Sequence, residues 1–426
     1  MTASVSPRRR REILDALRRG TVPSNGLDQL AVGLGRFETE LDAELSVVAG
    51  GGAMFKAVRG DYGSGKTFFA RWLADRATKR GFAVAEVQIN EIDTPLHKLE
   101  TVYRRSIESL RTASISPSAL RPILDAWLFT IEDDAAGQGV SVDELLERRL
   151  ADVDTRAPVF PMAIRAYRRM VEEGDNDGAD GLVAWLGGQP HVAAAVKRRA
   201  GLKGDLDNFL ALGFLRGLLA VLSDAGNAGL LLVLDEVETL QRVRSDARAK
   251  ALNALRQLVD EVHDGHFPGL YLLITGTPAF FEGRQGIQQL QPLADRLHTD
   301  FSRDPRFDNP RAPQLRLAGF DSDRLVELGI RVRELFCSGI DDAERVRQIA
   351  DDEFLRRFAA AVAGGLGGRV GIAPRLFLRK LVDVLDVIEL HTDFDPYTDY
   401  DVKIAASELS DTEREAVSAD DVELDI

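Results

Sequence analysis

Glycines, a lysine and a threonine stand together at residues 60–67, where the sequence is GDYGSGKT. The spacing matches GxxxxGK[ST], in which glycines let backbone N–H groups wrap a chain of phosphates. We assign phosphate contacts to the whole segment: Gly60, Asp61, Tyr62, Gly63, Ser64, Gly65, Lys66 and Thr67. Lys66 is predicted to bridge the β- and γ-phosphates of ATP, and the Thr67 hydroxyl to bind Mg²⁺. The alternative is a glycine-rich turn, but the apolar strand expected before it and the helix expected after it favour the phosphate-binding loop.

Two carboxylates end the apolar run LLLVLDE at residues 230–236. This is the Walker B form, in which Asp235 would hold Mg²⁺ through its water shell and Glu236 would orient or deprotonate an attacking water. Taken alone, such a run is more often a strand followed by a solvated turn, but the phosphate-binding loop in the same chain favours the catalytic interpretation. Alternation along the chain predicts that Glu238 points elsewhere, into solvent.

The next apolar strand spans residues 269–274, and Thr275-Gly276-Thr277-Pro278 follow it directly. Thr275 is a candidate for sensing the γ-phosphate or holding the water that attacks it. The alternative is that this segment only caps a helix, with Thr277 as the cap and Pro278 as the first helical residue. The two interpretations are compatible.

Two arginines far from the phosphate-binding loop in the sequence are candidates for contacting the γ-phosphate. Arg296 ends a predicted helix after the sensor strand, where it would reach a neighbouring subunit's nucleotide or merely stabilise the helix dipole. Arg375 opens a helix in the C-terminal region and is placed like a sensor 2 arginine, although it also fits an amphipathic face. Arg369 and Arg379 are rivals for that role.

The elements around these motifs predict an α/β fold with a parallel central sheet. Helices are expected at 8–19, 35–48 and 67–80, and strands at 54–58, 82–89, 229–234, 269–274 and 314–317. We divide the chain into an N-terminal helical segment, a core with a large helical insertion, a C-terminal helical lid and an acidic tail. The expected boundaries are 1–52, 53–320 with the insertion at about 92–228, 321–392, and 393–426.

Composition excludes several classes of protein. The single cysteine, Cys337, has no disulfide partner, and no apolar stretch is long enough for a signal peptide or a membrane helix, so we expect a cytoplasmic protein without membrane contact. The net charge is −14, of which residues 393–426 contribute −10, leaving −4 for the rest. DNA contact is therefore neither shown nor excluded. A metal site at His263 and His266 is not expected, because a turn separates them and no third ligand is near.

In order, the phosphate-binding loop, the Asp-Glu pair, the hydroxyl sensor and the lid arginine resemble an AAA+ ATPase over about residues 30–390. Residues 34–38, LGRFE, resemble a segment of the replication-origin initiator branch, whose members bind adenine near it. A closer resemblance is to the BREX phage-defence ATP-binding family (BrxD-like). It rests on ALRRGTVPSNGLDQLAVGLGR before the first strand, RGDYGSGKTFF, EVQINEID with the long helical insert, and APRLFLRKLVDVL.

The resemblance implies an ATPase that uses Mg²⁺ and works as motor or loader in a DNA-associated defence complex, as an ATP-dependent homo-oligomer. Its expected partners are other defence proteins (a helicase, nuclease or methyltransferase) and, once assembled, double-stranded DNA. Initiator relatives generally have a C-terminal winged helix, for which little sequence remains here after the lid. A nucleotide-gated switch or scaffold with slow hydrolysis is the leading alternative, and a STAND-like signalling ATPase the second.

Overall fold

The computed structural model describes residues 5–365 and 373–401, and a parallel sheet forms its centre. The strands are β1 (Met54–Arg59), β2 (Ala83–Gln88), β3 (Leu230–Asp235), β4 (Leu270–Gly276) and β5 (Gln314–Arg316). They lie in the order β2-β3-β4-β1-β5, so β4 separates β1 from β3. Because the strands are parallel, their carboxyl ends share one edge of the sheet, where ligands bind in open α/β folds.

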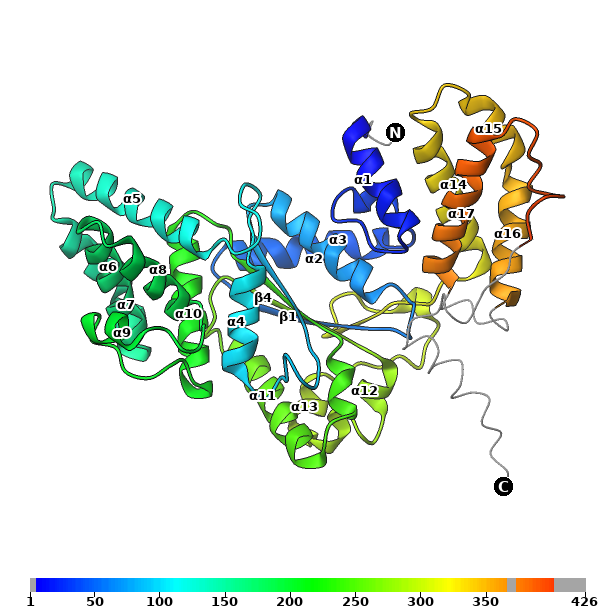
Figure 1. The fold of residues 1–426 in the computed structure, drawn as a ribbon. Coiled ribbons are helices and arrows are strands. Elements are labelled where there is room, and N and C mark those ends of the chain that lie inside the picture. The colour runs from blue at the N-terminus through cyan, green and yellow to red at the C-terminus, as the bar shows by residue number, and fades with distance from the viewer. Residues whose placement is uncertain (1–4, 366–372, 402–426) are drawn as a thin grey trace.

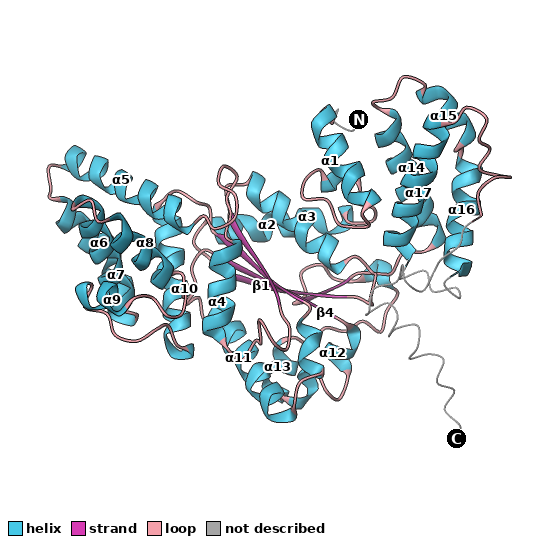
Figure 2. Ribbon diagram, viewed as in Figure 1, coloured by secondary structure: helices cyan, strands magenta, loops and turns pink. Residues whose placement is uncertain are grey.

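Helices cover both faces of this sheet (Figures 1 and 2). Alternate residues of β3 show why: Leu231 and Val233 pack toward one face, and Leu230 and Leu232 toward the other, so both faces are apolar. One face contacts α2 (Gly35–Ala49) and α3 (Lys66–Lys79). The opposite layer is formed by α4 (Leu99–Ser109), α11 (Ser245–His263), α12 (Pro278–Glu282) and α13 (Gln291–Arg296). The predicted α/β fold with a parallel central sheet is confirmed.

The insertion between β2 and β3 is helical, as the sequence predicts, and its outer helices form a lobe on the side of the molecule away from the lid helices (Figure 1). Besides α4 it contains α5 (Leu120–Gln138), α6 (Val142–Arg156), α7 (Val159–Glu172), α8 (Asn176–Leu186), α9 (Ala194–Arg199) and α10 (Asn208–Asp224). Buried aromatic side chains, among them Trp185 and Phe214 in edge contact, hold the lobe together. Its core is continuous with the core beneath the sheet.

The N-terminal helix packs with the C-terminal helices. The lid consists of α14 (Ser322–Cys337), α15 (Ala343–Ile349), α16 (Asp352–Gly365) and α17 (Ala373–Leu390). Ile13, Leu14 and Leu17 of α1 (Pro7–Arg18) share its apolar core, and Arg18 forms an ion pair with Asp386 of α17 at 2.7 Å. The segment after α1, which includes the 3-10 turn η1 (Leu27–Gln29), then returns to the sheet.

The beginning of the acidic tail packs on the lid. Tyr397 and Tyr400 contact the rings of Phe354 and Phe358 of α16, and the Tyr397 hydroxyl donates to Asp351 at 3.0 Å. Residues 393–401 therefore belong to the lid surface. Their aromatic side chains bury apolar surface against the lid, which the acidic composition of the segment does not reveal. The rest of the tail lies outside the described residues.

Lys56 of β1 is a fully buried cation with a complete set of partners. Its ammonium lies 2.5 Å from the buried carboxylate of Glu44 and donates to the carbonyl oxygens of Pro310 and Ala312. The Tyr271 hydroxyl donates to the same carboxylate at 2.5 Å. Burial raises the pKa of Glu44, so an unpaired carboxylate here would be costly.

Replacing Lys56 by Met should therefore lower the free energy of unfolding by about 3–5 kcal/mol, because Glu44 remains buried without its cation. The double variant Lys56→Met/Glu44→Leu, which removes both charges, should recover most of that loss. Urea denaturation followed by circular dichroism measures both. Equal stability of Lys56→Met and the native chain would contradict the analysis.

Candidate functional site

The loop between β1 and α3 has the backbone of a phosphate cradle. Gly63 and Gly65 adopt φ values of 76° and 92°, in the left-handed region that favours glycine. A Cβ atom at Gly60 would lie 2.3 Å from the Ser64 hydroxyl oxygen, so only glycine fits there. The loop leads directly into α3, whose N-terminal N–H groups and dipole favour an anion. The geometry fits the triphosphate chain that the sequence predicts.

Lys66 begins α3 and lies inside this loop, where its ammonium donates to the carbonyl oxygens of Gly60 at 2.9 Å and Asp61 at 3.2 Å. The Tyr62 ring centroid lies 5.2 Å from the ammonium. Glu238 Oε1 lies 3.6 Å from it, and both side chains are buried. A single cation thus faces backbone, aromatic and carboxylate groups at once.

Asp235, Thr67 and Thr275 form one hydrogen-bonded group at the sheet edge. Thr67 donates to Asp235 Oδ2 at 2.9 Å, and Thr275 donates to Asp235 Oδ1. The Thr275 hydroxyl also accepts from the backbone N–H of Glu236 at 3.1 Å. Hydroxyl and carboxylate oxygens are ligands that Mg²⁺ prefers, so Thr67 and Asp235 suit the metal role assigned to them.

Glu236 follows β3 in a left-handed backbone conformation with φ 62°. Its carboxylate accepts a hydrogen bond of 2.8 Å from the amide of Gln88, the last residue of β2. Sequence reasoning missed Gln88, although a polar residue that ends a strand beside the Asp-Glu strand was the available signal. The bond fixes the direction of the carboxylate that the sequence nominates as catalytic.

Glu238 overturns a sequence prediction, because it is 5% exposed rather than solvated. The left-handed turn at Glu236 ends the strand and starts the 3-10 turn η2 (Val237–Gln241), so strand alternation no longer applies. The turn directs Glu238 toward Lys66. Burial raises the pKa of this carboxyl, with nearby Lys66 opposing the shift.

A pocket of about 390 Å³ opens beside the phosphate-binding loop. Its walls come from residues 17–23 and 30–37 before β1, residues 62–68, Glu236 and Glu238 after β3, residues 317–328, and the first two turns of α17. Apolar side chains such as Val32, Phe320 and Leu378 contribute to its lining beside the charged groups Glu236 and Glu238. The pocket thus offers an apolar part for a base and a polar part for phosphates.

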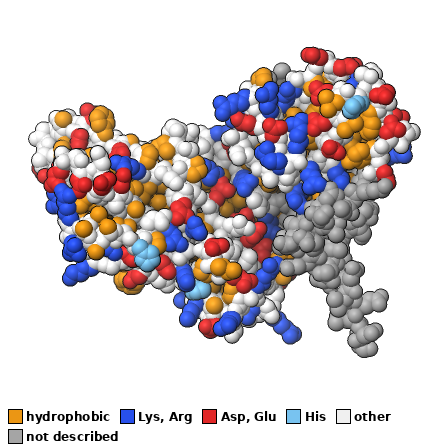
Figure 3. All heavy atoms as spheres, in the orientation of Figure 1, with side chains coloured by type: hydrophobic (Ala, Val, Ile, Leu, Met, Phe, Trp, Pro, Cys, Tyr) orange, Lys and Arg blue, Asp and Glu red, His pale blue; other side chains and the backbone are white. Residues whose placement is uncertain are grey.

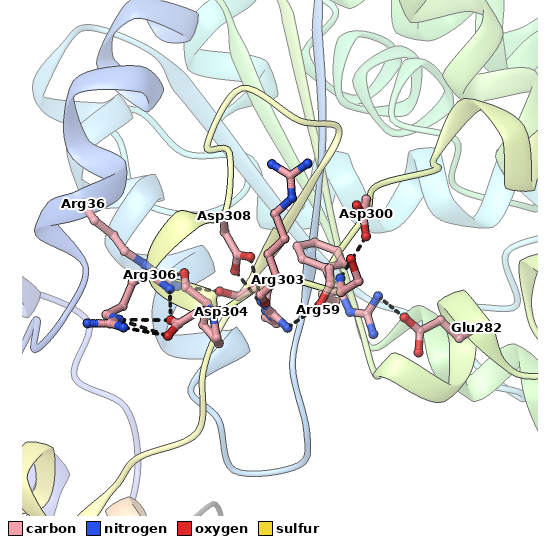
Figure 4. Close-up of polar contacts among 12 residues, drawn as sticks. Arg36, Arg59, Glu282, Asp300, Arg303, Asp304, Arg306 and Asp308 are labelled. Carbon is pink, nitrogen blue, oxygen red and sulfur yellow. Dashed lines mark hydrogen bonds and ion pairs between the residues drawn. The ribbon is translucent and has the colours of Figure 1, made fainter.

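Arg36, within the LGRFE segment, lines the pocket and fixes the loop before β5. Its guanidinium donates to the carbonyl oxygens of Pro305 and Arg316 at 2.9 and 2.8 Å. Figure 4 shows this loop, in which Asp304 pairs with Arg306, and the neighbouring ion pair between Arg59 of β1 and Glu282 of α12. The pocket wall and the loop are therefore one connected structure.

The two candidate arginines lie in different places. Arg375 lines the pocket, as a sensor 2 role requires. Arg296 ends α13 away from the pocket lining, where its guanidinium pairs with Asp260 of α11 and donates to the Pro292 carbonyl at 2.8 Å. Arg379 lies near Gly20, and Arg369 is outside the described residues.

The remaining sequence candidates are structural. Thr277 is the N-cap residue of α12 and Pro278 its first helical residue, as the capping alternative predicts, although the Thr277 side chain makes no capping hydrogen bond. Cys337 is buried in the lid core, and burial raises its pKa to about 11. Among residues 5–365 and 373–401, no group of three His, Cys, Asp or Glu side chains is placed to hold a metal ion. No helix in the same ranges is long and apolar enough to cross a membrane.

The parallel α/β fold and the loop at its sheet edge are those of a nucleotide-binding protein. The sequence model of the family described as "BREX system ATP-binding protein BrxC/D" matches residues 5–404, so the chain belongs to this family. No curated protein matches the chain. Among solved structures it is similar to the Aeropyrum pernix ORC2 protein, described in ADPNP-ADP complexes. The identity is 16%, the match covers 82% of this chain and 67% of that chain, and the TM-score is 0.34.

Proposed function

We propose that this protein binds and hydrolyses Mg-ATP as the motor or loader component of a DNA-associated phage-defence complex. The observation that carries the proposal is the hydrogen-bonded group Thr67–Asp235–Thr275 beside the phosphate cradle, because it joins the predicted phosphate, metal and sensor residues in one place. Family membership implies a defence system with further protein components, which are the expected partners.

Each residue has a definite task in this proposal. The loop N–H groups and Lys66 bind the phosphates, and Thr67 and Asp235 hold Mg²⁺, which neutralises charge on the triphosphate. Glu236 orients the attacking water or accepts its proton, while Gln88 sets the direction of its carboxylate. Thr275 fixes Asp235 and the Glu236 backbone, and Arg375 contacts the nucleotide from the lid.

The second candidate function is a nucleotide-gated switch that hydrolyses slowly and recruits a helicase or nuclease. The Gln88 hydrogen bond favours it, because the Glu236 carboxylate already accepts from this amide and an attacking water must share or displace that contact. Steady-state turnover separates the two functions, since a motor turns over without its partners and a switch does so only slowly.

Glu236→Gln should keep ATP binding and slow hydrolysis by a factor of about 10² or more, because the water loses its acceptor while the Mg²⁺ ligands remain. Lys66→Ala should instead lose ATP binding. Fluorescent-nucleotide titration and phosphate release under single-turnover conditions measure the two effects. Turnover of Glu236→Gln at the native rate would contradict its catalytic role.

Arg296→Ala tests whether hydrolysis needs a second subunit. If Arg296 reaches a neighbour's γ-phosphate, the variant should bind ATP but not hydrolyse it, and mixing it with Glu236→Gln should restore some activity at mixed interfaces. Asp260→Ala is the matched control, because it breaks the same ion pair and leaves the arginine. Equal loss in Asp260→Ala and Arg296→Ala, without complementation, would make the pair structural.

We infer that DNA binding requires assembly. Arginines of the insertion are neutralised within the chain: Arg168 pairs with Asp143 and Glu172, and Arg199 pairs with Glu173 and Asp175. Basic and acidic side chains are interspersed on the face drawn in Figure 3. These two arginines are therefore already engaged and contribute little to phosphate binding by one subunit.

Duplex DNA should accordingly bind weakly to the protein alone and more tightly with ATP or a partner protein, because assembly adds contacts along one duplex. The affinity should fall steeply with salt and depend little on sequence. Fluorescence anisotropy at several salt concentrations, with and without ATP, measures this. Tight, sequence-specific binding by the ATP-free monomer would contradict the inference.

A further inference from the structure

Glu238 is a buried carboxylate that the proposed hydrolysis does not use. It comes from η2, the turn that follows the Asp-Glu pair, and reaches across to the phosphate-binding loop. Its Oε1 lies 3.6 Å from the Lys66 ammonium, and its Oε2 is buried without any hydrogen-bond partner. Burial of a carboxylate with one oxygen lacking a hydrogen-bond partner costs free energy of folding, so the position of Glu238 beside Lys66 needs an explanation.

A second contact joins the same two segments. Arg242, the residue after η2, faces the Tyr62 side chain of the loop and opposes the rise in the Tyr62 pKa. Tyr62 also places its ring 5.2 Å from Lys66, and burial raises its pKa, with Glu238 adding to the shift. The turn after the Asp-Glu pair thus holds the loop at both Lys66 and Tyr62.

We propose that Glu238 is a positioning residue that competes with nucleotide phosphates for Lys66 and so weakens nucleotide binding. The proposal rests on the nucleotide-binding function above. Glu238 already sets one carboxylate beside the buried Lys66 ammonium, and a nucleotide adds further negative charge to the same cation. Phosphates that bind Lys66 must therefore displace the Glu238 contact or share the ammonium with it, in surroundings of low dielectric constant.

This competition makes affinity depend on Glu238 in a direction opposite to that of an ordinary binding residue. Loss of a residue that holds the ligand weakens binding, whereas loss of a competitor strengthens it. An amide at this position has nearly the same shape and still offers an oxygen to Lys66, so Glu238→Gln removes the charge with little change in packing.

The test measures binding of fluorescent ADP with Mg²⁺ to the full chain and to three variants. Glu238→Gln should bind about tenfold more tightly than the native protein, and Glu238→Asp, which keeps the charge, should stay closer to the native affinity. Glu132→Gln on the exposed surface of α5 is the control for net charge and should bind as the native chain does.

The rise of the thermal unfolding midpoint on addition of ADP distinguishes competition for Lys66 from a purely structural role of Glu238. Glu238→Gln should lower the midpoint of the protein alone, because Lys66 loses its anion, yet it should show a larger rise on addition of ADP than the native protein. Binding by Glu238→Gln that is equal to or weaker than native would overturn the competition while leaving the proposed function intact. Failure of the native chain to bind ADP would instead overturn both.

Discussion

The site depends on the order of the strands. Asp235 ends β3, Thr67 follows β1, and the two strands are not neighbours in the sheet, because β4 lies between them. Thr275 near the end of β4 fills that interval and donates to the same carboxylate that Thr67 contacts. A sheet with β1 beside β3 would leave no place for the middle hydroxyl. The parallel order therefore places the hydroxyl sensor between the loop and the metal ligand.

Much of the fold is predictable because local signals agree. Both faces of the sheet are buried, so β3 and β4 are continuous apolar runs, and the glycines of the loop have conformations that other residues rarely adopt. The site residues from β1, β3 and β4 converge because parallel strands end at one edge. These inferences need only the order of the elements along the chain and the periodicity of apolar residues within each element.

The errors have a common physical cause, since each concerns a contact that the local pattern does not encode. Glu238 was expected in solvent because strand alternation was extended past Glu236, where the backbone turns left-handed. The role of Gln88 follows only from its 2.8 Å hydrogen bond to Glu236, which lies 148 positions later in the chain. The apolar face of α1 is visible in the sequence, but its partner α17 begins more than 350 residues later.

That last contact changes how the lid is attached to the sheet. Residues 317–321 connect β5 to α14, and the segment after α1 makes a second crossing, because α1 belongs to the lid core while Leu34 and Phe37 belong to the core between the sheet and helices α2 and α3. Both crossings line the pocket, together with the first two turns of α17. A rotation of the lid relative to the sheet must therefore bend two chain segments that form the pocket wall. The volume of the pocket therefore changes when the lid moves, because the two chain segments that join lid and sheet also form the pocket wall. Arg36 links this wall to β5 and the loop before it, through its hydrogen bonds to the carbonyl oxygens of Arg316 and Pro305.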